Sequence, residues 1–203
     1  MLDERAPCGA LLICLEIYYY GYMEFQKTTL KDAYLIKPQV LQDERGFFIE
    51  TYSEKQFKEA GIDADFVQDN HSQSVTKGTL RGLHFQSGED AQAKLVRVTK
   101  GAVYDVIVDL RKNSPTFGKW EGFELTDNNF YLLYVPRGFA HGFCTLADYT
   151  EFQYKCDNFY APESEGGLIW NDPDLKIYWP IENPILSDKD KKLPFFKDLN
   201  SPF

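Results

Sequence analysis

An all-β sandwich or barrel is the fold class that this sequence predicts. From Ala33 onward, short apolar and aromatic runs alternate with turn residues at close spacing, which is the pattern of antiparallel strands. The chain contains 16 Phe and 13 Tyr in 203 residues, and aromatic side chains favour strands. Neither a repeat nor a low-complexity linker divides the sequence, so we expect one domain with a substantial core.

The first part of the predicted domain contains three strands and one short helix. The strands are expected over residues 34–41, 46–52 and 65–74. The helix lies between the second and third strands. Ser53 can cap its first turn, and Gly61 ends it.

Six further strands are expected in the second part of the domain. They cover residues 94–98, 103–110, 120–126, 130–135, 140–146 and 149–156. The first four are predicted to pair as two hairpins, because Lys100-Gly101 and Asp127-Asn128-Asn129 are short turn sequences. Beyond Tyr160 the sequence becomes rich in proline and irregular.

Residues 1–22 differ from the rest of the chain. Their apolar run is interrupted by Glu16 and is too short to cross a bilayer. The segment also lacks the basic start of a signal peptide. We therefore expect residues 1–22 to be a non-native or disordered extension, followed by a single domain over residues 23–203.

The charge and the cysteines limit the classes of partner. The net charge of −9 argues against binding to nucleic acid or to an anionic membrane, because each would require a basic face. An anionic ligand would have to be held by local cations. The four cysteines show neither a C-x-x-C spacing nor a dense framework, which is typical of reduced thiols in a cytoplasmic protein.

The run Gly-Thr-Leu-Arg-Gly-Leu-His-Phe-Gln at residues 78–86 carries the first candidate site residues. It places Arg81 and His84 in one short strand, shortly before Lys94. Histidine is a base near neutral pH, while Arg and Lys can hold a phosphate or a developing oxyanion. The combination favours proton abstraction from an anionic substrate over an interior histidine with a purely structural role.

Strand alternation separates two of these residues. His84 and Gln86 share one face of a regular strand, and Arg81 falls on the other face. A bulge or twist at Gly82 would bring Arg81 back to the face of His84.

The run Pro136-Arg137-Gly138-Phe139-Ala140-His141 contains a turn that aims His141 into a strand. Its P-x-G-x-x-H spacing resembles the second motif of the cupin superfamily. The first cupin motif brings an H-x-H pair, but the matching position here reads His84-Phe85-Gln86. Two histidines, with His71 as the only other imidazole in the chain, do not make a secure metal site. The resemblance implies a metal-free cupin-type jelly-roll barrel with a few short helices.

An ordered series of motifs from about Glu24 to about Leu193 resembles the dTDP-4-dehydrorhamnose 3,5-epimerase family. Its members are the runs at residues 43–48, 66–72, 80–86, 94–97, 136–143 and 170–172, with Tyr154-Lys155 and Tyr160. The resemblance implies an isomerase that acts on a nucleotide sugar without a cofactor, as a homodimer. It would epimerise C3 and C5 of dTDP-4-dehydro-6-deoxy-D-glucose through enolates and give dTDP-4-dehydro-L-rhamnose.

The resemblance assigns three residues to the chemistry. His84 is the base and Tyr154 the acid, and epimerisation requires two such groups on opposite faces of a carbon. Because C3 and C5 flank the C4 ketone, loss of either proton gives an enolate, whose oxygen Lys94 would stabilise. Tyrosine is a suitable donor because its pKa of about 10 keeps it protonated at neutral pH.

The partner of the base is expected near the C-terminus. The run Leu186-Ser187-Asp188-Lys189-Asp190 matches the family, so Asp190 would orient and charge His84. Asp172 is the alternative, although its Asn-Asp-Pro setting favours a turn cap.

The resemblance also implies a set of substrate-binding residues. Tyr160 would stack on thymine, while the side chains of Gln68 and Asn70 would lie near the nucleotide. The complete set is Arg45, Glu50, Gln68, Asp69, Asn70, Arg81, Lys94, His141, Tyr160, Glu165 and Lys189.

Three alternative functions differ from this one in the residues that they need. A relative could epimerise C3 only or C5 only, on a related nucleotide 4-ketosugar. A noncatalytic sugar-binding cupin would keep the aromatic residues and lose the acid and base. A metal-dependent cupin oxygenase would need the missing H-x-H pair.

Overall fold

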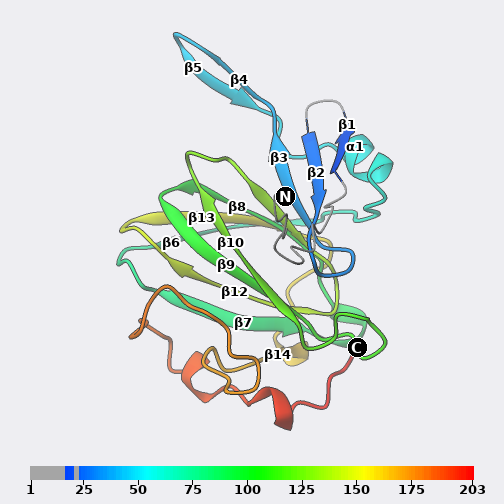
Figure 1. Ribbon diagram of the computed structural model, residues 1–203, viewed down its shortest axis with the longest axis vertical. Helices are drawn as coiled ribbons and strands as arrows, with labels where there is room; N and C mark the ends of the chain where they lie inside the picture. Colours follow the sequence, from blue (N-terminus) through cyan, green and yellow to red (C-terminus); the bar gives the residue numbers. More distant parts are fainter. Residues whose placement is uncertain (1–16, 21–22) are drawn as a thin grey trace, which may run out of the picture.

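Two antiparallel sheets pack face to face in this computed structural model, which describes residues 17–20 and 23–203 (Figure 1). The seven-stranded sheet contains, in spatial order, β1 (Ile17–Tyr20), β2 (Met23–Lys27), β3 (Tyr34–Pro38), β11 (Leu132–Val135), β8 (Lys94–Lys100), β13 (Thr150–Cys156) and β6 (Gln68–Ser74). The five-stranded sheet contains β10 (Trp120–Thr126), β9 (Ala102–Asp109), β12 (Phe139–Thr145), β7 (Leu80–Gln86) and β14 (Glu165–Gly167). The predicted all-β barrel is confirmed.

The core between the sheets follows strand alternation. Val96 and Val98 of β8 face Val103 and Ile107 of β9, and aromatic side chains of β12 and β13 complete this cluster. The burial of this apolar surface is the main favourable contribution to folding, about 25 cal/mol per Å². The barrel interior is therefore packed over part of its length, and polar side chains are confined to the remainder.

Both predicted hairpins are wrong, although their strands exist. β8 pairs with β11 and β13, whereas β9 pairs with β10 and β12 in the other sheet. In the same way, β10 and β11 belong to different sheets. The turns at Lys100-Gly101 and residues 127–129 are thus corners that carry the chain from one sheet to the other, as in a jelly roll.

The strand expected over residues 34–41 is divided in two. β3 ends at Pro38, and β4 (Val40–Asp43) pairs only with β5 (Gly46–Ile49). This two-stranded ribbon, called the arm below, projects from the body of the molecule at the top of Figure 1. Its aromatic side chains are open to solvent, and Phe48 is 67% exposed.

The predicted helix is α1 (Glu54–Glu59), but Ser53 makes no side-chain cap hydrogen bond. The expected cap is therefore wrong, because the first turn is stabilised by the backbone of Ser53, whose carbonyl accepts from the Phe57 N–H. The end of the helix is as expected, since Gly61 follows it at a φ of +82°. Phe57 packs against the outer face of the seven-stranded sheet.

The extension expected over residues 1–22 is described in part. Ile17–Tyr20 form β1, which pairs with β2 at one end of the seven-stranded sheet. Residues 1–16 and 21–22 lie outside the described residues. Across the remainder, none of the helices has the length and apolar character needed to cross a membrane.

The segment after β14 passes over the outside of the five-stranded sheet, in orange and red at the bottom of Figure 1. Trp170, Trp179 and Leu199 pack there in a second core cluster, on the outer face of the five-stranded sheet, which includes Val106 and Val108 of β9. Ile185 is joined to β7 by the hydrogen bonds of a parallel bridge with Thr79. This C-terminal segment therefore has a fixed position beside β7, and it contains the short helices η3 (Asp190–Lys192) and η4 (Phe196–Asp198).

Candidate active site

A cavity of about 430 Å³ lies between the two sheets and the C-terminal segment. Seven of its lining side chains are polar and titratable or charged: Arg81, His84, Lys94, His141, Tyr154, Lys189 and Asp190. The apolar lining includes Phe143 and Phe152, whose rings stack with centroids 4.1 Å apart. The cavity thus combines an aromatic wall with a concentration of cations in a chain of net charge −9.

His84 of β7 is held by Asp190 of the C-terminal segment. The distance between His84 Nε2 and Asp190 Oδ1 is 2.6 Å, so the predicted contact is present. Because an ionised carboxylate only accepts hydrogen bonds, Nε2 carries the proton, and Nδ1 is the nitrogen with a free lone pair. His84 can therefore act as a base through Nδ1, while Asp190 stabilises the imidazolium that forms.

Asp190 is itself fixed by its neighbours. Its N–H donates to the Ser187 hydroxyl, at 3.0 Å. Burial alone would raise the pKa of Asp190, but the hydrogen bond and charge of His84, with further hydrogen bonds from Ser187 and the Gly82 backbone, leave this pKa below its usual value. Asp190 is therefore ionised at neutral pH. The alternative partner, Asp172, instead caps a turn by accepting from the N–H groups of Asp174 and Leu175.

Tyr154 lines the same cavity from the other sheet. It lies on β13, whereas His84 lies on β7, so their side chains approach the cavity from opposite walls. Burial raises the pKa of the Tyr154 hydroxyl, and the charge of Arg81 acts in the opposite direction. Tyr154 therefore stays protonated at neutral pH and can donate a proton.

Arg81 reaches the cavity because β7 is irregular. Between the paired residues His141 and Phe143 of β12, the register with β7 moves from His84 to Arg81, so three steps on β7 face two on β12. The predicted bulge at Gly82 is thus confirmed. Gly82 has a φ of +119°, and a Cβ there would lie 2.6 Å from the Gly142 Cα, so only glycine fits.

Lys94 supplies the second cation of the cavity. Its ammonium lies 6.0 Å from the centroid of the Tyr154 ring. Among the described residues, it has no hydrogen bond or ion pair within the chain. Burial lowers the pKa of Lys94, and the nearby charges of Cys156, Asp105 and Glu165 oppose this effect. An ammonium at this place without a direct hydrogen bond or ion pair can stabilise an oxyanion that develops during a reaction.

His141 is held by a carboxylate that the sequence analysis does not single out. Its Nε2 lies 3.0 Å from each carboxylate oxygen of Asp105 on the adjacent strand β9. The sequence does contain a signal for this residue. In the run Val103 to Leu110, alternation places Asp105 on the same face as Val103 and Ile107, and an aspartate is rarely buried without a partner.

The rim of the cavity connects to an exposed aromatic residue. Glu165 Oε2 lies 2.5 Å from the Lys189 ammonium and accepts from the Tyr160 hydroxyl at 3.0 Å. The Tyr160 ring is 58% exposed, and its backbone N–H donates to Gln68 Oε1 at 3.1 Å. Gln68 in turn donates to Asn70. These predicted binding residues form one hydrogen-bonded set beside the cavity.

Three predicted binding residues are not brought to the cavity. Asp69 alternates with Gln68 and Asn70 along β6, so it lies on the outer face and pairs with Lys155 at 2.8 Å. Arg45 lies on the arm and pairs with Asp43, and Glu50 accepts a hydrogen bond from Gln56. Strand alternation accounts for the position of Asp69, and the separate arm accounts for that of Arg45. A motif match reveals neither the alternation nor the arm.

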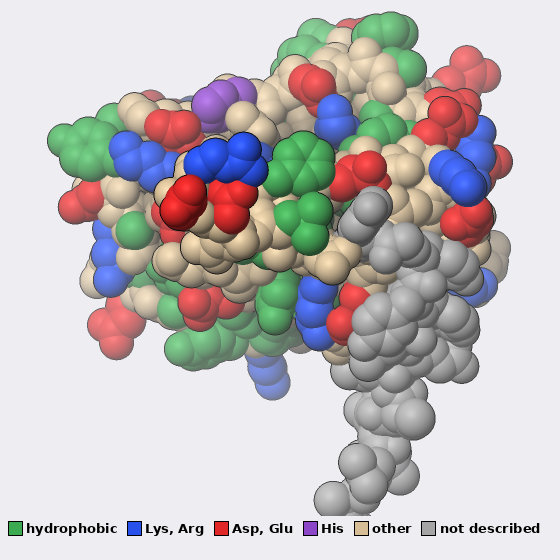
Figure 2. All heavy atoms as spheres, turned by 90° about the horizontal axis from the view of Figure 1, so that it is seen from above, with side chains coloured by type: hydrophobic (Ala, Val, Ile, Leu, Met, Phe, Trp, Pro, Cys, Tyr) green, Lys and Arg blue, Asp and Glu red, His purple; other side chains and the backbone are tan. Residues whose placement is uncertain are grey.

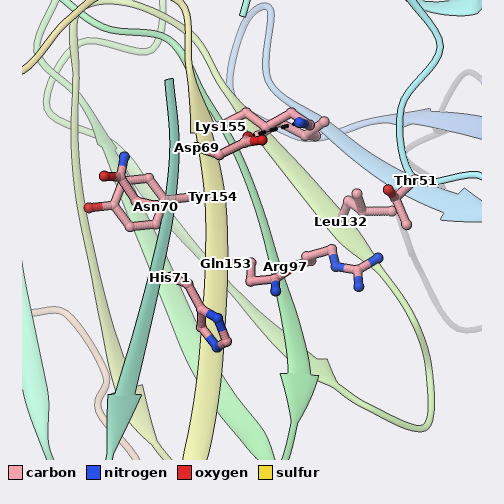
Figure 3. A pocket seen from close by; sticks show the side chains of 10 residues that line it. Thr51, Asp69, Asn70, His71, Arg97, Leu132, Gln153, Tyr154 and Lys155 are labelled. Atoms are coloured by element: carbon pink, nitrogen blue, oxygen red, sulfur yellow. Dashed lines mark hydrogen bonds and ion pairs between the residues drawn. The ribbon is translucent and has the colours of Figure 1, made fainter. Parts of the chain in front are cut away.

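A second pocket lies on the outer face of the seven-stranded sheet (Figure 3). Figure 3 shows Tyr154 on one side of β13 and Gln153 with Arg97 on the other, as alternation requires. Arg97 and Gln153 therefore line this second pocket and not the cavity, whereas Tyr154 contributes to the lining of both. Figure 2 shows acidic and basic side chains interspersed on the face that it presents, without one dominant sign.

The H-x-H position has a different role here. Gln86 donates to the carbonyls of Asp90 and Phe159 and accepts from the Ala161 N–H, so all of these contacts are structural. Within residues 17–20 and 23–203, His, Cys, Asp and Glu side chains form no group of three or more suited to a metal ion. The arrangement offers acid and base groups and cations.

Comparisons with known proteins agree with this chemistry. A family model described as dTDP-4-dehydrorhamnose 3,5-epimerase matches residues 27–198. The dTDP-4-dehydrorhamnose 3,5-epimerase of Shigella flexneri is 54% identical over 169 residues, which cover 83% of this chain and 93% of that protein. The matched residues 27–198 include every cavity residue named above.

Solved structures give the same similarity. The crystal structure of dTDP-4-dehydrorhamnose 3,5-epimerase from Elizabethkingia anophelis superposes with a TM-score of 0.85 at 55% identity, covering 89% of this chain and 100% of that chain. A dTDP-6-deoxy-D-glucose-3,5-epimerase of Legionella pneumophila, in complex with dTDP-4-keto-L-rhamnose, gives 0.84 at 44% identity, with coverages of 88% and 95%.

Proposed function

The chain belongs to the dTDP-4-dehydrorhamnose 3,5-epimerase family, and we propose that its cavity converts dTDP-4-dehydro-6-deoxy-D-glucose to dTDP-4-dehydro-L-rhamnose. The observation that carries this proposal is the placement of a base and an acid on opposite walls. His84 comes from the five-stranded sheet and Tyr154 from the seven-stranded sheet. A carbon bound between them can lose a proton on one face and gain one on the other.

The first step is removal of a proton next to the C4 ketone. His84 Nδ1 takes the proton from C3 or C5, and the electrons of the C–H bond form an enolate with the charge on the C4 oxygen. Asp190 stabilises the imidazolium through the 2.6 Å contact to Nε2. Lys94, whose ammonium makes no direct ion pair in the described chain, is the cation proposed to stabilise the enolate oxygen.

The second step delivers a proton to the other face. Tyr154 donates its hydroxyl proton to the enolate carbon, and the C4 ketone re-forms with inverted configuration at that carbon. The pKa of Tyr154, raised mainly by burial, keeps this proton in place until the enolate forms. This inversion leaves His84 protonated and Tyr154 as a phenolate, so His84 gives its proton to solvent and Tyr154 takes one from solvent before the next inversion. Repetition at the other carbon gives the double epimerisation, and the enzyme is an isomerase that needs no cofactor.

The nucleotide is proposed to bind at the rim. Tyr160 presents an exposed ring for stacking on thymine, and Gln68 and Asn70 lie beside it. Arg81 and Lys94 extend the cationic surface from this rim into the cavity, which suits the diphosphate and the sugar.

Hydrogen exchange in D2O tests the assignment of the base and the acid. The His84→Ala variant should lose both product formation and deuterium entry at C3 and C5, because no enolate forms. The Tyr154→Phe variant should lose inversion and keep exchange, because His84 can return a deuteron to the face from which it took the proton. NMR of the two positions separates the outcomes, and robust exchange in His84→Ala would falsify His84 as the base.

The same measurement addresses the alternative functions. A C3-only or C5-only relative would incorporate deuterium at one position in the wild-type reaction, whereas the proposed enzyme incorporates it at both. A noncatalytic binding protein would bind dTDP without any exchange.

A homodimer is the proposed assembly, with the arm reaching the second subunit. The arm projects from the body of the molecule (Figure 1). It carries Arg45, which does not line the cavity of its own chain, and its Phe47 and Phe48 are exposed. Contiguous exposed aromatic residues are typical of an interface. Delivery of the arm to a partner would bring Arg45, and with it Glu50, toward a second cavity.

Mixing variants tests this assembly. Arg45→Ala and His84→Ala are each expected to be poorly active alone. A mixed dimer would contain one cavity with an intact His84 and an Arg45 from the other subunit, so co-refolding the two variants should restore part of the activity. A clean monomer in sedimentation, or a mixture no more active than its components, would overturn the proposal.

The cellular compartment is proposed from the thiols. Cys144 and Cys156 are both free and buried in the part of the chain that the structure describes. Free thiols are retained most readily in a reducing compartment, so we propose a cytoplasmic enzyme. Fractionation of cells that produce the protein would test this location.

A further inference from the structure

Asp105 is a fully buried carboxylate beside the cavity that the mechanism above does not use. It lies on β9 between Val103 and Ile107, faces the interior of the barrel, and is 0% exposed. A carboxylate in this position loses its hydration and is retained only where it has partners. Its partners therefore indicate what it does.

The first partner is His141, and the contact fixes a proton. Both carboxylate oxygens of Asp105 lie 3.0 Å from His141 Nε2. An ionised carboxylate accepts from that nitrogen, so Nε2 carries a proton in both charge states of the imidazole. Nδ1 is left as the only ring nitrogen of His141 that a ligand in the cavity can engage.

The orientation of His141 is fixed as well as its proton. Its ring stacks on Phe152 with an interplanar angle of 22° and a centroid distance of 6.2 Å. Phe152 in turn stacks on Phe143 at 4.1 Å. Together with the two-oxygen contact to Asp105, this packing leaves the imidazole one orientation at the cavity wall.

The second partner is the charge of Lys94. Burial raises the pKa of Asp105, and the charges of His141 and Lys94 oppose burial. The interaction is mutual, because Asp105 is also one of the negative groups that oppose the effect of burial on the ammonium of Lys94. Asp105 thus lies behind two residues that line the cavity, His141 on β12 and Lys94 on β8.

We propose that Asp105 is a positioning residue for the epimerisation, which fixes His141 with its proton on Nε2 and provides a counter-charge for Lys94 beside the enolate. The proposal rests on the proposed function for the role of Lys94. Asp105 does not line the cavity, so it acts through these two side chains. Its loss should therefore affect the chemical step more than the binding of the nucleotide.

Asp109 provides a matched control. It lies four residues further along the same strand, is also 0% exposed, and pairs with Arg111 at 2.9 Å. Ser114 and Thr116 donate to it as well, and none of these residues lines the cavity. Asp109→Asn removes a buried charge from β9 without touching His141 or Lys94.

The test compares Asp105→Asn with Asp109→Asn in the full chain. Asp105→Asn should lower kcat at least tenfold while KM for the dTDP ketosugar and Kd for dTDP change less than threefold. Asp109→Asn should lower the melting temperature and leave kcat within twofold. If Asp105→Asn retains the wild-type kcat, or if Asp109→Asn loses kcat to the same extent, Asp105 has a structural role and the proposal is wrong.

A measurement on the wild-type protein does not depend on how the variants fold. The chain has three histidines, so the ¹⁵N signals of the imidazole rings can be assigned with His71→Gln and His141→Gln. The proposal requires a protonated Nε2 on His141, and a spectrum with the proton on Nδ1 alone overturns it. Failure of the proposed function would be seen separately, as wild-type protein that binds dTDP without turning over the ketosugar.

Discussion

Two histidine–aspartate pairs lie at the same cavity, and they are built differently. His84 contacts one oxygen of Asp190 at 2.6 Å, and the side chains are 28% and 4% exposed. His141 contacts both oxygens of Asp105 at 3.0 Å, and the side chains are 7% and 0% exposed. The first pair joins a strand to the C-terminal segment, whereas the second joins two adjacent strands of one sheet.

The difference is the one expected between the proposed base and a supporting residue. A base must reach the substrate and change its charge during turnover, so partial exposure and a single strong contact suit the role proposed for His84. A side chain that only holds a fixed orientation can be enclosed by the barrel, and His141 is enclosed in this way. Changes at one pair, at the rim and outside both pairs test this contrast.

The largest effect is expected from Asp190→Asn. The amide can donate to His84 Nε2 and so favour the wrong tautomer, and it no longer stabilises the imidazolium. We expect kcat to fall by about 10² to 10⁴-fold, with little change in KM. Steady-state kinetics and deuterium exchange would measure this, and a variant with more than a tenth of wild-type kcat would remove the distinction between the pairs.

A smaller effect is expected at the rim, from Tyr160→Ala. The loss of base stacking should weaken binding by about 1 to 3 kcal/mol and raise KM, while kcat is retained because neither pair changes. Phe159→Ala is the control, since Phe159 is a neighbouring exposed ring with no assigned contact to the nucleotide. An unchanged KM with a collapsed kcat for Tyr160→Ala would contradict the stacking role.

The pH dependence of stability should have opposite signs for the two carboxylates. His84 leaves the pKa of Asp190 below its usual value, although burial opposes this. Its stabilising contribution is therefore present above about pH 4 and is lost as the pH falls. Burial raises the pKa of Asp105, so the folded state binds this proton more readily, and the contribution of Asp105 to stability improves as the pH falls.

Urea unfolding between pH 3 and pH 7 would measure these signs. Asp190→Asn should cost more stability at pH 7 than at pH 3, and Asp105→Asn should cost less at pH 7 than at pH 3. If the stability lost by the two variants changes in the same direction with pH, the two carboxylates do not differ in the way described.

A small effect is expected from starting the chain at Met23. Neither pair contacts the removed residues within the described part of the chain, and β1 adds only to β2 at one end of its sheet. The shortened protein should fold and turn over like the full chain. A large fall in melting temperature would show that residues 1–22 belong to the domain.

No effect is expected from chelation. His84 and His141 each use Nε2 to contact a carboxylate. The second position of the H-x-H pair is occupied by Gln86, which makes structural hydrogen bonds. Treatment with EDTA should leave kcat unchanged. Loss of activity that a divalent ion restores would require a metal-dependent mechanism.

The strands could be predicted from the sequence, but their partners could not. Alternation and turn residues locate β8, β9, β10 and β11 within a few residues. A short turn sequence does not indicate whether the chain stays in one sheet or crosses to the other. Here the turns at residues 100–101 and 127–129 both carry the chain between sheets. The pairing is decided by burial on both sides of the barrel, which involves residues far apart in the chain.

The site could be predicted in part, for a similar reason. The family motifs give His84, Tyr154 and Asp190, which the fold brings to one cavity. They do not reveal that Asp69 faces outward, since that depends on strand alternation. Asp105 was missed because it belongs to no motif, although a charge in an apolar alternating run is itself an indication of a buried partner.

The contribution of the C-terminal segment to the cavity links occupancy of the site to the integrity of the fold. A ligand that contacts Lys189 as well as the barrel binds only when the segment is docked, so it stabilises docking by mass action. Occupied enzyme should therefore resist cleavage between β14 and Asp190 better than empty enzyme. A protease that nicks this stretch is expected to leave the strands paired and to free Asp190 from His84, so turnover should be lost before the barrel unfolds.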